Sequence, residues 1–382
     1  MNRNLILVAI SLFAWGIGEG LFIYFQPLYL QEWGADPILI GSIYSAMGIA
    51  MALAQIPSGY LSDRFGARSM MIGSWIIGTL AAWFMALAGS MPMFIVGIVL
   101  YGLTGFVVAP MSSYITNVRG NLSVGRALTF ASGLYNAGAV LGPITGGFIA
   151  QTLGFQKVYL LAGIIFILST IIVLFVKKDP EIHHADQESI QSVGLLKNYR
   201  FLAFLGVAMV SFFALYLPQP LTPNFLQNQQ EYSRSTIGIL GAFGSLGNAV
   251  AMLALGNLGA VTGFIIGQVW MLVFAVLFLT GNSPVWFGVA YFFVGGYRLC
   301  RSMVLAIARP LVHPKQTGLA YGMIETTASL SIITAPILGG VLYKQAPLSL
   351  YQVSIILIGL VLVMNLVVFS VIRKRRQHDP QH

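Results

Sequence analysis

Long apolar runs, separated by short polar connections, make up most of the chain. A helix needs about 20 mostly apolar residues to cross a bilayer. We expect helices, because unpaired backbone polar groups cannot be left in lipid. Twelve stretches fit: 5–30, 38–60, 69–89, 92–116, 127–151, 157–176, 201–222, 236–255, 259–280, 284–308, 318–343 and 350–372. The pattern predicts an all-α membrane protein with twelve transmembrane helices.

Lysine and arginine are unevenly distributed among the connections. With both termini in the cytoplasm, fifteen of the 20 basic residues lie inside and three outside. The inside set is Arg3, Arg64, Arg68, Arg119, Arg126, Lys177, Lys178, Lys197, Arg200, Arg309, Lys315 and the tail Arg373 to Arg376; the outside set is Lys157, Arg234 and Lys344. This bias follows the positive-inside rule. It predicts a multi-pass protein of the cell membrane (plasma or inner), with both termini cytoplasmic.

Composition supports this interpretation and narrows the function. Residues are 57% hydrophobic and only 8% charged, against about 25% charged in soluble domains. The net charge of +9 is expected to face anionic membrane lipids rather than nucleic acid. A single cysteine, Cys300, permits no internal disulfide, and no metal-ligand cluster is recognisable. No His falls within a predicted span, so we expect no enzyme, no cofactor and no metal. We expect a monomer.

The chain divides at its longest polar connection. We expect an N-terminal six-helix bundle (1–178), a cytoplasmic linker (179–200) and a C-terminal six-helix bundle with a basic tail (201–382). The halves resemble each other at a shift near 193 residues: "GPITGG" from Gly142 recurs as "APILGG" from Ala335. Parallel repeats of this kind are typical of alternating-access carriers, with a site between the halves near the midplane. Chance recurrence of proline and glycine is the alternative.

The connection between spans 2 and 3, "GYLSDRFGAR", resembles the signature loop of the major facilitator superfamily. The matching residues are Gly59, Asp63, Arg64, Gly66 and Arg68; alanine replaces the first residue of the usual closing basic pair. The resemblance extends over nearly the whole chain, since span count, linker and repeated halves also fit. It implies that the loop latches the cytoplasmic side. Asp63 would be the hydrogen-bond acceptor facing the start of span 11, and Arg126 is a possible partner of Asp63. Topology alone could also explain the arginines.

Span 5 carries "GAVLGPITGG", which resembles a motif of proton-coupled antiporters in this superfamily, particularly drug exporters. The matching residues are Gly138, Gly142, Pro143, Gly146 and Gly147. Small residues also allow close helix packing, which is the alternative explanation. Span 4 lacks the intramembrane arginine that those antiporters often carry, which argues against their usual proton relay.

Four charged residues lie within predicted spans, away from the span ends: Glu19, Arg298, Arg301 and Glu325. The resemblance implies that spans 1, 4, 7 and 10 line a central cavity, with 2, 5, 8 and 11 beside them. At 1.5 Å per residue, Arg301 and Glu325 both lie about 10 Å from the cytoplasmic ends of their spans. We therefore predict that they form an ion pair, which could be purely structural.

Arg298 and Glu19 then remain unexplained. A guanidinium suits a substrate carboxylate or phosphate, so Arg298 is a candidate anion site. Burial disfavours the ionised form of a carboxyl group, so Glu19 is the candidate proton-coupling residue. Glu19 could instead pair with Arg298 when no substrate is present.

Aromatic and amide side chains on several spans would complete a cavity for an amphipathic ligand. The further substrate-binding candidates are Trp15, Phe22, Gln26, Tyr135, Asn136, Tyr216, Gln219 and Tyr291, beside Arg298, Arg301 and Glu325. Ordinary helix packing is the alternative for any one aromatic.

The expected function is secondary transport of a small organic or amphipathic compound, anionic or zwitterionic, by alternating access. The span 5 motif favours proton-coupled export. Proton-coupled uptake of an organic anion, or lipid flipping on the same scaffold, remains open. The chain lacks the sequence G-x-x-x-x-G-K-(S/T), so an ion gradient is the expected energy source.

Overall fold

The computed structural model describes residues 2–177, 195, 197–255, 258–312 and 317–378, in which every regular element is a helix. Most of the expected linker, 179–200, lies outside this part. The elements are α1 (Arg3–Ile23), α2 (Gln26–Glu32), α3 (Pro37–Phe65), α4 (Ala67–Ala86), α5 (Met91–Leu103), η1 (Thr104–Val107), α6 (Val108–Asn117), α7 (Val124–Leu153), α8 (Phe155–Leu174), α10 (Tyr199–Tyr216), α11 (Thr222–Asn228), α12 (Arg234–Leu255), α13 (Ala260–Thr280), α14 (Pro284–Phe292), α15 (Gly295–Ala308), η2 (Arg309–Leu311), α16 (Thr317–Gln345) and α17 (Ser349–His378).

Helix starts follow the local sequence. The Asp36 side chain accepts from the backbone N–H of Leu39 at 2.8 Å, and Pro37 begins α3. Ser283 caps α14 in the same way, ahead of Pro284. Both pairs place a capping acceptor before a proline whose missing N–H costs nothing at the first helical position.

Nine helices in the described residues are long and apolar enough to cross a membrane, or ten if the bent pair 91–107 and 110–117 counts as one. Each predicted span overlaps a helix or a helix pair in the predicted order. Two predicted spans, 127–151 and 284–308, are not among the ten. They correspond to the glycine-rich α7 and to the broken pair α14–α15, which contains two arginines. Twelve spans and cytoplasmic termini therefore stay predictions.

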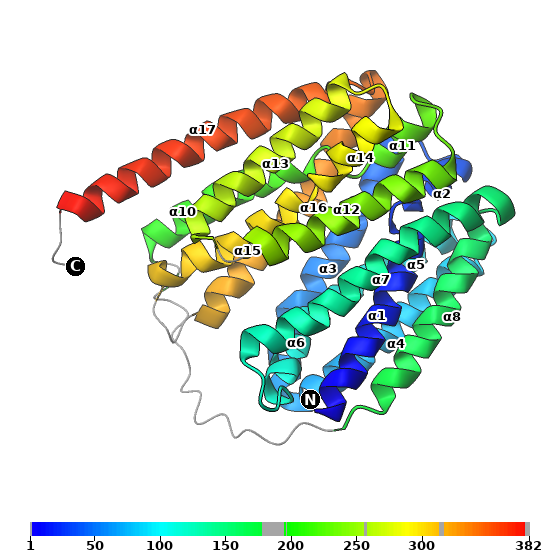
Figure 1. Ribbon diagram of the computed structural model, residues 1–382, viewed down its shortest axis with the longest axis horizontal. Helices are drawn as coiled ribbons and strands as arrows, with labels where there is room; N and C mark the ends of the chain where they lie inside the picture. Colours follow the sequence, from blue (N-terminus) through cyan, green and yellow to red (C-terminus); the bar gives the residue numbers. More distant parts are fainter. Residues whose placement is uncertain (1, 178–194, 196, 256–257, 313–316, 379–382) are drawn as a thin grey trace.

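The helices pack first with neighbours in their own half of the chain. In the first half, α1 packs against α7 and α8, and α4 against α5 and α8; in the second, α13 packs against α15 and α17, and α10 against α16. Two long contacts join the halves: α3 with α16, and α7 with α12 (Figure 1). The chain's N-terminus lies at the end opposite α2 and α11.

The repeated "GPITGG/APILGG" segments form equivalent contacts between the halves. A Cβ added to Gly238 on α12 would lie 2.2 Å from the Pro143 carbonyl oxygen on α7. A Cβ added to Gly41 on α3 would lie 2.2 Å from the Pro336 carbonyl oxygen on α16. Both glycines therefore allow backbone-to-backbone approach. The match indicates that the repeat reflects structural symmetry rather than chance.

The remaining glycines of the span 5 motif pack within the first half. Cβ atoms added to Gly138, Gly142 and Gly146 would each lie within 2.5 Å of a carbonyl oxygen of α1. Gly147 instead faces α12, because its added Cβ would lie 2.6 Å from the Arg234 carbonyl oxygen. One face of the motif thus fixes α7 to α1, and the adjacent positions hold α7 against the other half.

Candidate functional site: a charged cluster between the halves

Glu19 lies on α1 where that helix meets α7. The Tyr135 hydroxyl donates a hydrogen bond to Oε2 of Glu19 at 2.9 Å. Tyr101, from α5, also interacts with the Glu19 carboxyl group. A charge-assisted hydrogen bond of this kind stabilises and orients the carboxylate. Two tyrosines of the first half therefore hold Glu19 in place.

Arg298 reaches this carboxyl group from α15 in the second half. Its guanidinium interacts with Tyr135, Glu19 and Tyr24. Its side chain is exposed although Leu299 and Cys300 beside it are fully buried. Among the described residues, no ion pair within 4.0 Å joins Arg298 to Glu19. The hydroxyl of Tyr135 hydrogen-bonds both groups.

We call Glu19, Tyr24, Tyr101, Tyr135 and Arg298 the central cluster. It brings together three residues that the sequence analysis selected, Glu19, Tyr135 and Arg298. Sequence reasoning missed Tyr24 and Tyr101. Tyr101 is a polar residue on span 4, one of the spans expected to line the cavity, and that position was the available signal.

Tyr24 contacts the second half directly. Its hydroxyl lies 3.5 Å from Oγ of Ser245 on α12, and its ring centroid lies 6.0 Å from that of Tyr291. Gly241 and Gly244 leave room for the ring, because a Cβ added to either would lie within 2.9 Å of Tyr24. The two halves therefore meet closely beside the cluster.

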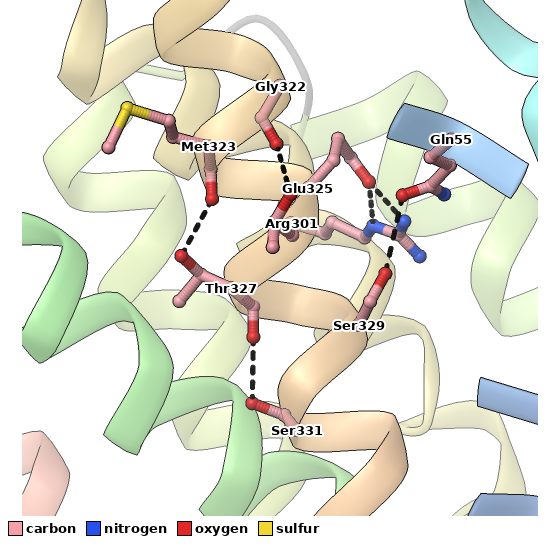
Figure 2. A network of polar contacts seen from close by, with 9 residues as sticks. Gln55, Arg301, Gly322, Met323, Glu325, Thr327, Ser329 and Ser331 are labelled. Carbon is pink, nitrogen blue, oxygen red and sulfur yellow. Dashed lines mark hydrogen bonds and ion pairs between the residues drawn. The ribbon is translucent and has the colours of Figure 1, made fainter. Parts of the chain in front are cut away.

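Arg301 and Glu325 form the ion pair that their matched depth predicts. Nε of Arg301 donates to Oε2 of Glu325 at 3.2 Å, and an Nη atom contacts the same oxygen. One turn further along α16, the hydroxyl of Ser329 donates to Oε1 of Gln55 on α3 at 3.4 Å, as Figure 2 shows. The side chains of the pair are 30% and 31% exposed. The pair therefore also lies at the boundary between the halves.

Trp15 and Phe22 lie inside the first half rather than at the boundary. Trp15 stacks on Phe166 with ring centroids 4.3 Å apart, and Phe22 stacks on Tyr159 at 5.3 Å. Gln26 is also fully buried, with its amide near the Met85 sulfur at 3.7 Å. Helix packing accounts for all three. Substrate contact by these residues stays a prediction without support from this arrangement.

The other candidates are partly exposed or packed near the boundary. Nδ2 of Asn136 donates to the Ser132 carbonyl, and Nε2 of Gln219 to the Leu215 carbonyl, each at 2.8 Å. Tyr216 is half-buried and interacts with Arg301. Tyr291 is 3% exposed, and its hydroxyl has no hydrogen-bond partner among the described atoms. A ligand or a water molecule could satisfy that group.

Polar pairs join the halves at the end of the molecule that holds α2 and α11. The Arg234 guanidinium pairs with Glu32, and Nζ of Lys344 lies 2.7 Å from Oδ2 of Asp36. Gln31 of α2 also accepts from Asn224 and Asn228 of α11, at 2.6 and 3.0 Å. We call Gln31, Glu32 and Asp36, with Asn224, Asn228, Arg234 and Lys344, the clasp. Two of the three basic residues expected outside are therefore paired with acids of the other half.

The hydrogen bonds from Lys344 and from the Leu39 backbone lower the pKa of Asp36 below the ordinary aspartate value. The direction follows because both donors favour the ionised carboxylate. The Asp36–Lys344 pair therefore stays charged at neutral pH.

The signature loop lies at the other end. Gly59 and Asp63 lie in α3, but their side-chain surroundings and residues 313–316 fall outside what the structure describes, so the Asp63 contact stays a prediction. Nε of Arg68 donates to the Val176 carbonyl at 2.6 Å, within the same half. Arg64 and Arg126 are exposed. Gly66, with φ of +80°, turns the chain between α3 and α4.

Among the described residues, no group of three or more His, Cys, Asp and Glu side chains could hold a metal. The charged chemistry in the interior therefore belongs to Glu19, Arg298 and the Arg301–Glu325 pair. Hydrogen bonding and ion pairing are what these groups perform in this arrangement.

Comparison with known proteins shows which family has this architecture. The family model described as Major Facilitator Superfamily matches residues 6–259 and 204–382. The chain is 24% identical to the Multi-drug resistance efflux pump PmrA homolog of Lactococcus lactis, over 96% of this chain and 94% of that one. It is 25% identical to the Multidrug resistance protein MdtG of Escherichia coli, over 98% and 96%. A match to an uncharacterised transporter of this type from Methanocaldococcus jannaschii spans about half of each chain, 53%, at 25% identity.

Solved structures show the same fold. A crystal structure of a mutant of the nucleoside transporter NupG aligns with a TM-score of 0.78 at 16% identity, covering 96% of this chain and 99% of that one. The crystal structure of the human organic anion transporter MFSD10 (TETRAN) aligns with a TM-score of 0.70 at 14% identity, covering 95% and 99%. With the helical architecture and the family match over nearly all of its length, the chain belongs to the Major Facilitator Superfamily and is a multi-pass membrane transporter.

Proposed function

We propose that this transporter exports a small amphipathic organic compound, zwitterionic or anionic, in exchange for protons. The observation that carries the proposal is the central cluster. It places a carboxyl group of the first half and a guanidinium of the second half around one tyrosine hydroxyl. An ionisable residue inside a membrane bundle marks a proton or substrate site by default, and this one lies between the halves.

Glu19 is the proposed proton carrier. When it is ionised, Arg298 and the two tyrosines compensate its charge. When it is protonated, Arg298 no longer faces a negative charge across the boundary between the halves. Protonation therefore changes the interaction between the halves at the level where a ligand would bind, as alternating access requires.

The moving parts are proposed to be the two six-helix bundles, 1–178 and 201–382. The clasp would close one end, and the predicted topology places this end outside. The described arrangement would then be closed to the outside, with the central cluster accessible from the cytoplasm. Separation of the α7–α12 and α3–α16 contacts would reverse that access.

Export is favoured over uptake by the relatives. The printed names of the Lactococcus and Escherichia proteins describe a multi-drug resistance efflux pump and a multidrug resistance protein. The half-buried aromatic residues near the cluster are suited to amphipathic ligands. Energy would come from the proton gradient.

Purified protein in proteoliposomes tests the proposal. A pH gradient is imposed, and labelled organic anions, cations and zwitterions are screened for movement against their own gradient. Export requires that ligand moves opposite to the proton flux. Movement in the same direction as the protons would indicate uptake instead of export. Absence of gradient-driven movement for every ligand would refute proton coupling.

A further inference from the structure

Three helices of the first half share a buried polar contact that uses all of its donors. These helices, α1, α4 and α8, form the first, third and sixth spans of that half. Nε1 of Trp75 donates to the hydroxyls of Ser11 and Ser169 at 2.7 and 2.9 Å. Each serine hydroxyl also lies within 3.0 Å of the backbone carbonyl oxygen of the other serine. The indole thus closes the contact.

The second half has polar residues on its equivalent helices, α10, α13 and α17, but no indole among them. Gln268 on α13 stands 193 positions after Trp75. Its side chain is fully buried, and neither amide atom has a hydrogen-bond partner among the described atoms. Nδ2 of Asn365 on α17 donates to the Ser211 hydroxyl at 3.1 Å, and that hydroxyl donates to the Val207 carbonyl. Oδ1 of Asn365 is buried and has no partner among the described atoms.

The helices α13 and α17 pack against each other in antiparallel directions. The ring centroids of Phe264 and Phe369 lie 6.2 Å apart. Further along α13 and further back along α17, those of Phe278 and Tyr351 lie 5.2 Å apart. Positions that move forward on α13 therefore meet positions that move back on α17.

This register places the two buried amides at one level. Gln268 follows Phe264 by four residues and Asn365 precedes Phe369 by four residues, which is about one helical turn in each case. Gln268 and Asn365 therefore share a level on adjacent helices. They are not hydrogen-bonded to each other, because neither amide atom of Gln268 has a partner.

A ligand for these amides must both accept and donate hydrogen bonds. Nε2 of Gln268 needs an acceptor, whereas Oε1 of Gln268 and Oδ1 of Asn365 need donors. A cation would satisfy the oxygens and leave Nε2 unpaired. Water satisfies all three atoms, and internal water molecules typically make about three hydrogen bonds to buried polar groups. The exchange of a tryptophan for a smaller glutamine at the equivalent position also favours room for it.

We propose that one or two water molecules are bound inside the second bundle, between the side-chain amides of Gln268 and Asn365. They supply the hydrogen bonds that Trp75 supplies in the first bundle. An unpaired amide is costly in a protein interior surrounded by lipid, and bound water offsets that cost. The two bundles therefore differ inside: an indole seals the polar contact of the first, and the polar contact of the second is hydrated.

Electron cryomicroscopy of the full-length protein, at a resolution that shows internal water molecules, tests this directly. We expect a density peak at about 2.7–3.2 Å from an amide atom of Gln268 and from Oδ1 of Asn365. Two results would overturn the inference. One is a direct hydrogen bond between the two amides, and the other is absence of a peak there while water is visible at other buried sites.

Substitution of Gln268 gives a second test, with opposite signs for the two cases. If water satisfies the amides, Gln268→Leu expels it and leaves Oδ1 of Asn365 unpaired. The Tm in detergent should then fall by about 2–4 °C, the shift for one hydrogen bond in a bundle of this size. If the amides lack water, leucine removes unsatisfied groups and the Tm should rise. An unchanged or higher Tm would therefore overturn the inference.

Two further variants complete this test. Gln268→Leu/Asn365→Leu should recover part of the lost Tm, because no unpaired amide remains. Gln352→Leu, an exposed amide on α17, is the matched control and should keep the wild-type Tm. If Gln268→Leu does not fold, the density in the wild-type protein decides the matter alone.

Discussion

The hydroxyl of Tyr135 donates its hydrogen bond to Glu19 while the same tyrosine contacts Arg298 from the other half of the molecule. One hydroxyl group thus connects the two charges on which the proposed mechanism depends. Loss of this hydroxyl would remove both contacts at once.

Tyr135→Phe should slow gradient-driven transport, because the Glu19 carboxyl group loses the hydroxyl that holds it and that also contacts Arg298. A hydrogen bond worth about 0.5–1.5 kcal/mol corresponds to a rate lower by about 2- to 12-fold. Transport rates in proteoliposomes under a fixed pH gradient measure the effect. Tyr159→Phe, in a fully buried tyrosine of the same half whose hydroxyl lacks a described partner, is the control. An unchanged rate in Tyr135→Phe would show that this hydroxyl does not position the carboxyl group.

Substitution of one partner of the Arg301–Glu325 pair should destabilise the protein more than substitution of both. A lone charge left at this depth is uncompensated, and burial of such a charge costs several kcal/mol when it is complete. With about a third of each side chain exposed, we expect Glu325→Gln to destabilise the protein by about 1–3 kcal/mol. The double variant Arg301→Gln/Glu325→Gln should recover part of this loss. Thermal unfolding in detergent measures it, and simple additivity of the single variants would contradict an energetic coupling of the pair.

Gly238→Ala should hold the clasp end of the molecule open. Its Cβ would lie 2.2 Å from the Pro143 carbonyl oxygen, and neither backbone can yield without separating α7 from α12. Gly206→Ala is the control, since a Cβ there meets nothing within 4 Å. Labelling of a cysteine introduced at Ser235 in a Cys300→Ser background reports access. Accessibility no greater than that of Gly206→Ala would show that this contact does not limit opening.

The charge state of the Asp36–Lys344 pair should make access at the clasp end independent of pH over a defined range. The pKa of Asp36 is lowered by Lys344, so the contribution of the pair is present above the ordinary aspartate value of about 3.9 and is lost below it. Access at the clasp end should therefore not change through this pair between pH 5 and 8. Asp36→Asn should increase access across that whole range, measured by the same labelling. A wild-type transition in that range that Asp36→Asn abolishes would contradict the assigned direction.

Helices marked by apolar runs, and an ion pair between residues at equal depth on adjacent spans, could be predicted from the sequence. The order of helices follows from apolar runs, and the Arg301–Glu325 pair follows from matched distances along adjacent spans. Trp15 and Phe22 show the limit of this reasoning. They share a helix face with Glu19 at steps of three and four, but helix rotation turns them into the aromatic interior of the first half. Their rotation is fixed by glycine contacts of α7 with α1, which sequence spacing does not reveal.

Contacts between the halves were also beyond sequence reasoning. Arg234 and Lys344 looked like exceptions to the positive-inside bias, and only the folded arrangement shows their partners Glu32 and Asp36. Tyr24 was overlooked because it lies at the end of α1 and interacts with a helix more than 200 positions away. Long-range pairing of this kind depends on the relative placement of the two bundles.

Uphill transport by Glu19→Gln in proteoliposomes tests the central claim most directly. Wild-type protein and the variant are compared in two assays with the same ligand: accumulation driven by a pH gradient, and exchange of labelled for unlabelled ligand without a gradient. The account predicts that Glu19→Gln loses gradient-driven accumulation and retains exchange, because the substituted site still binds ligand but cannot carry the proton. Gradient-driven accumulation at the wild-type level in Glu19→Gln would contradict the assignment of Glu19 as the proton-coupling residue.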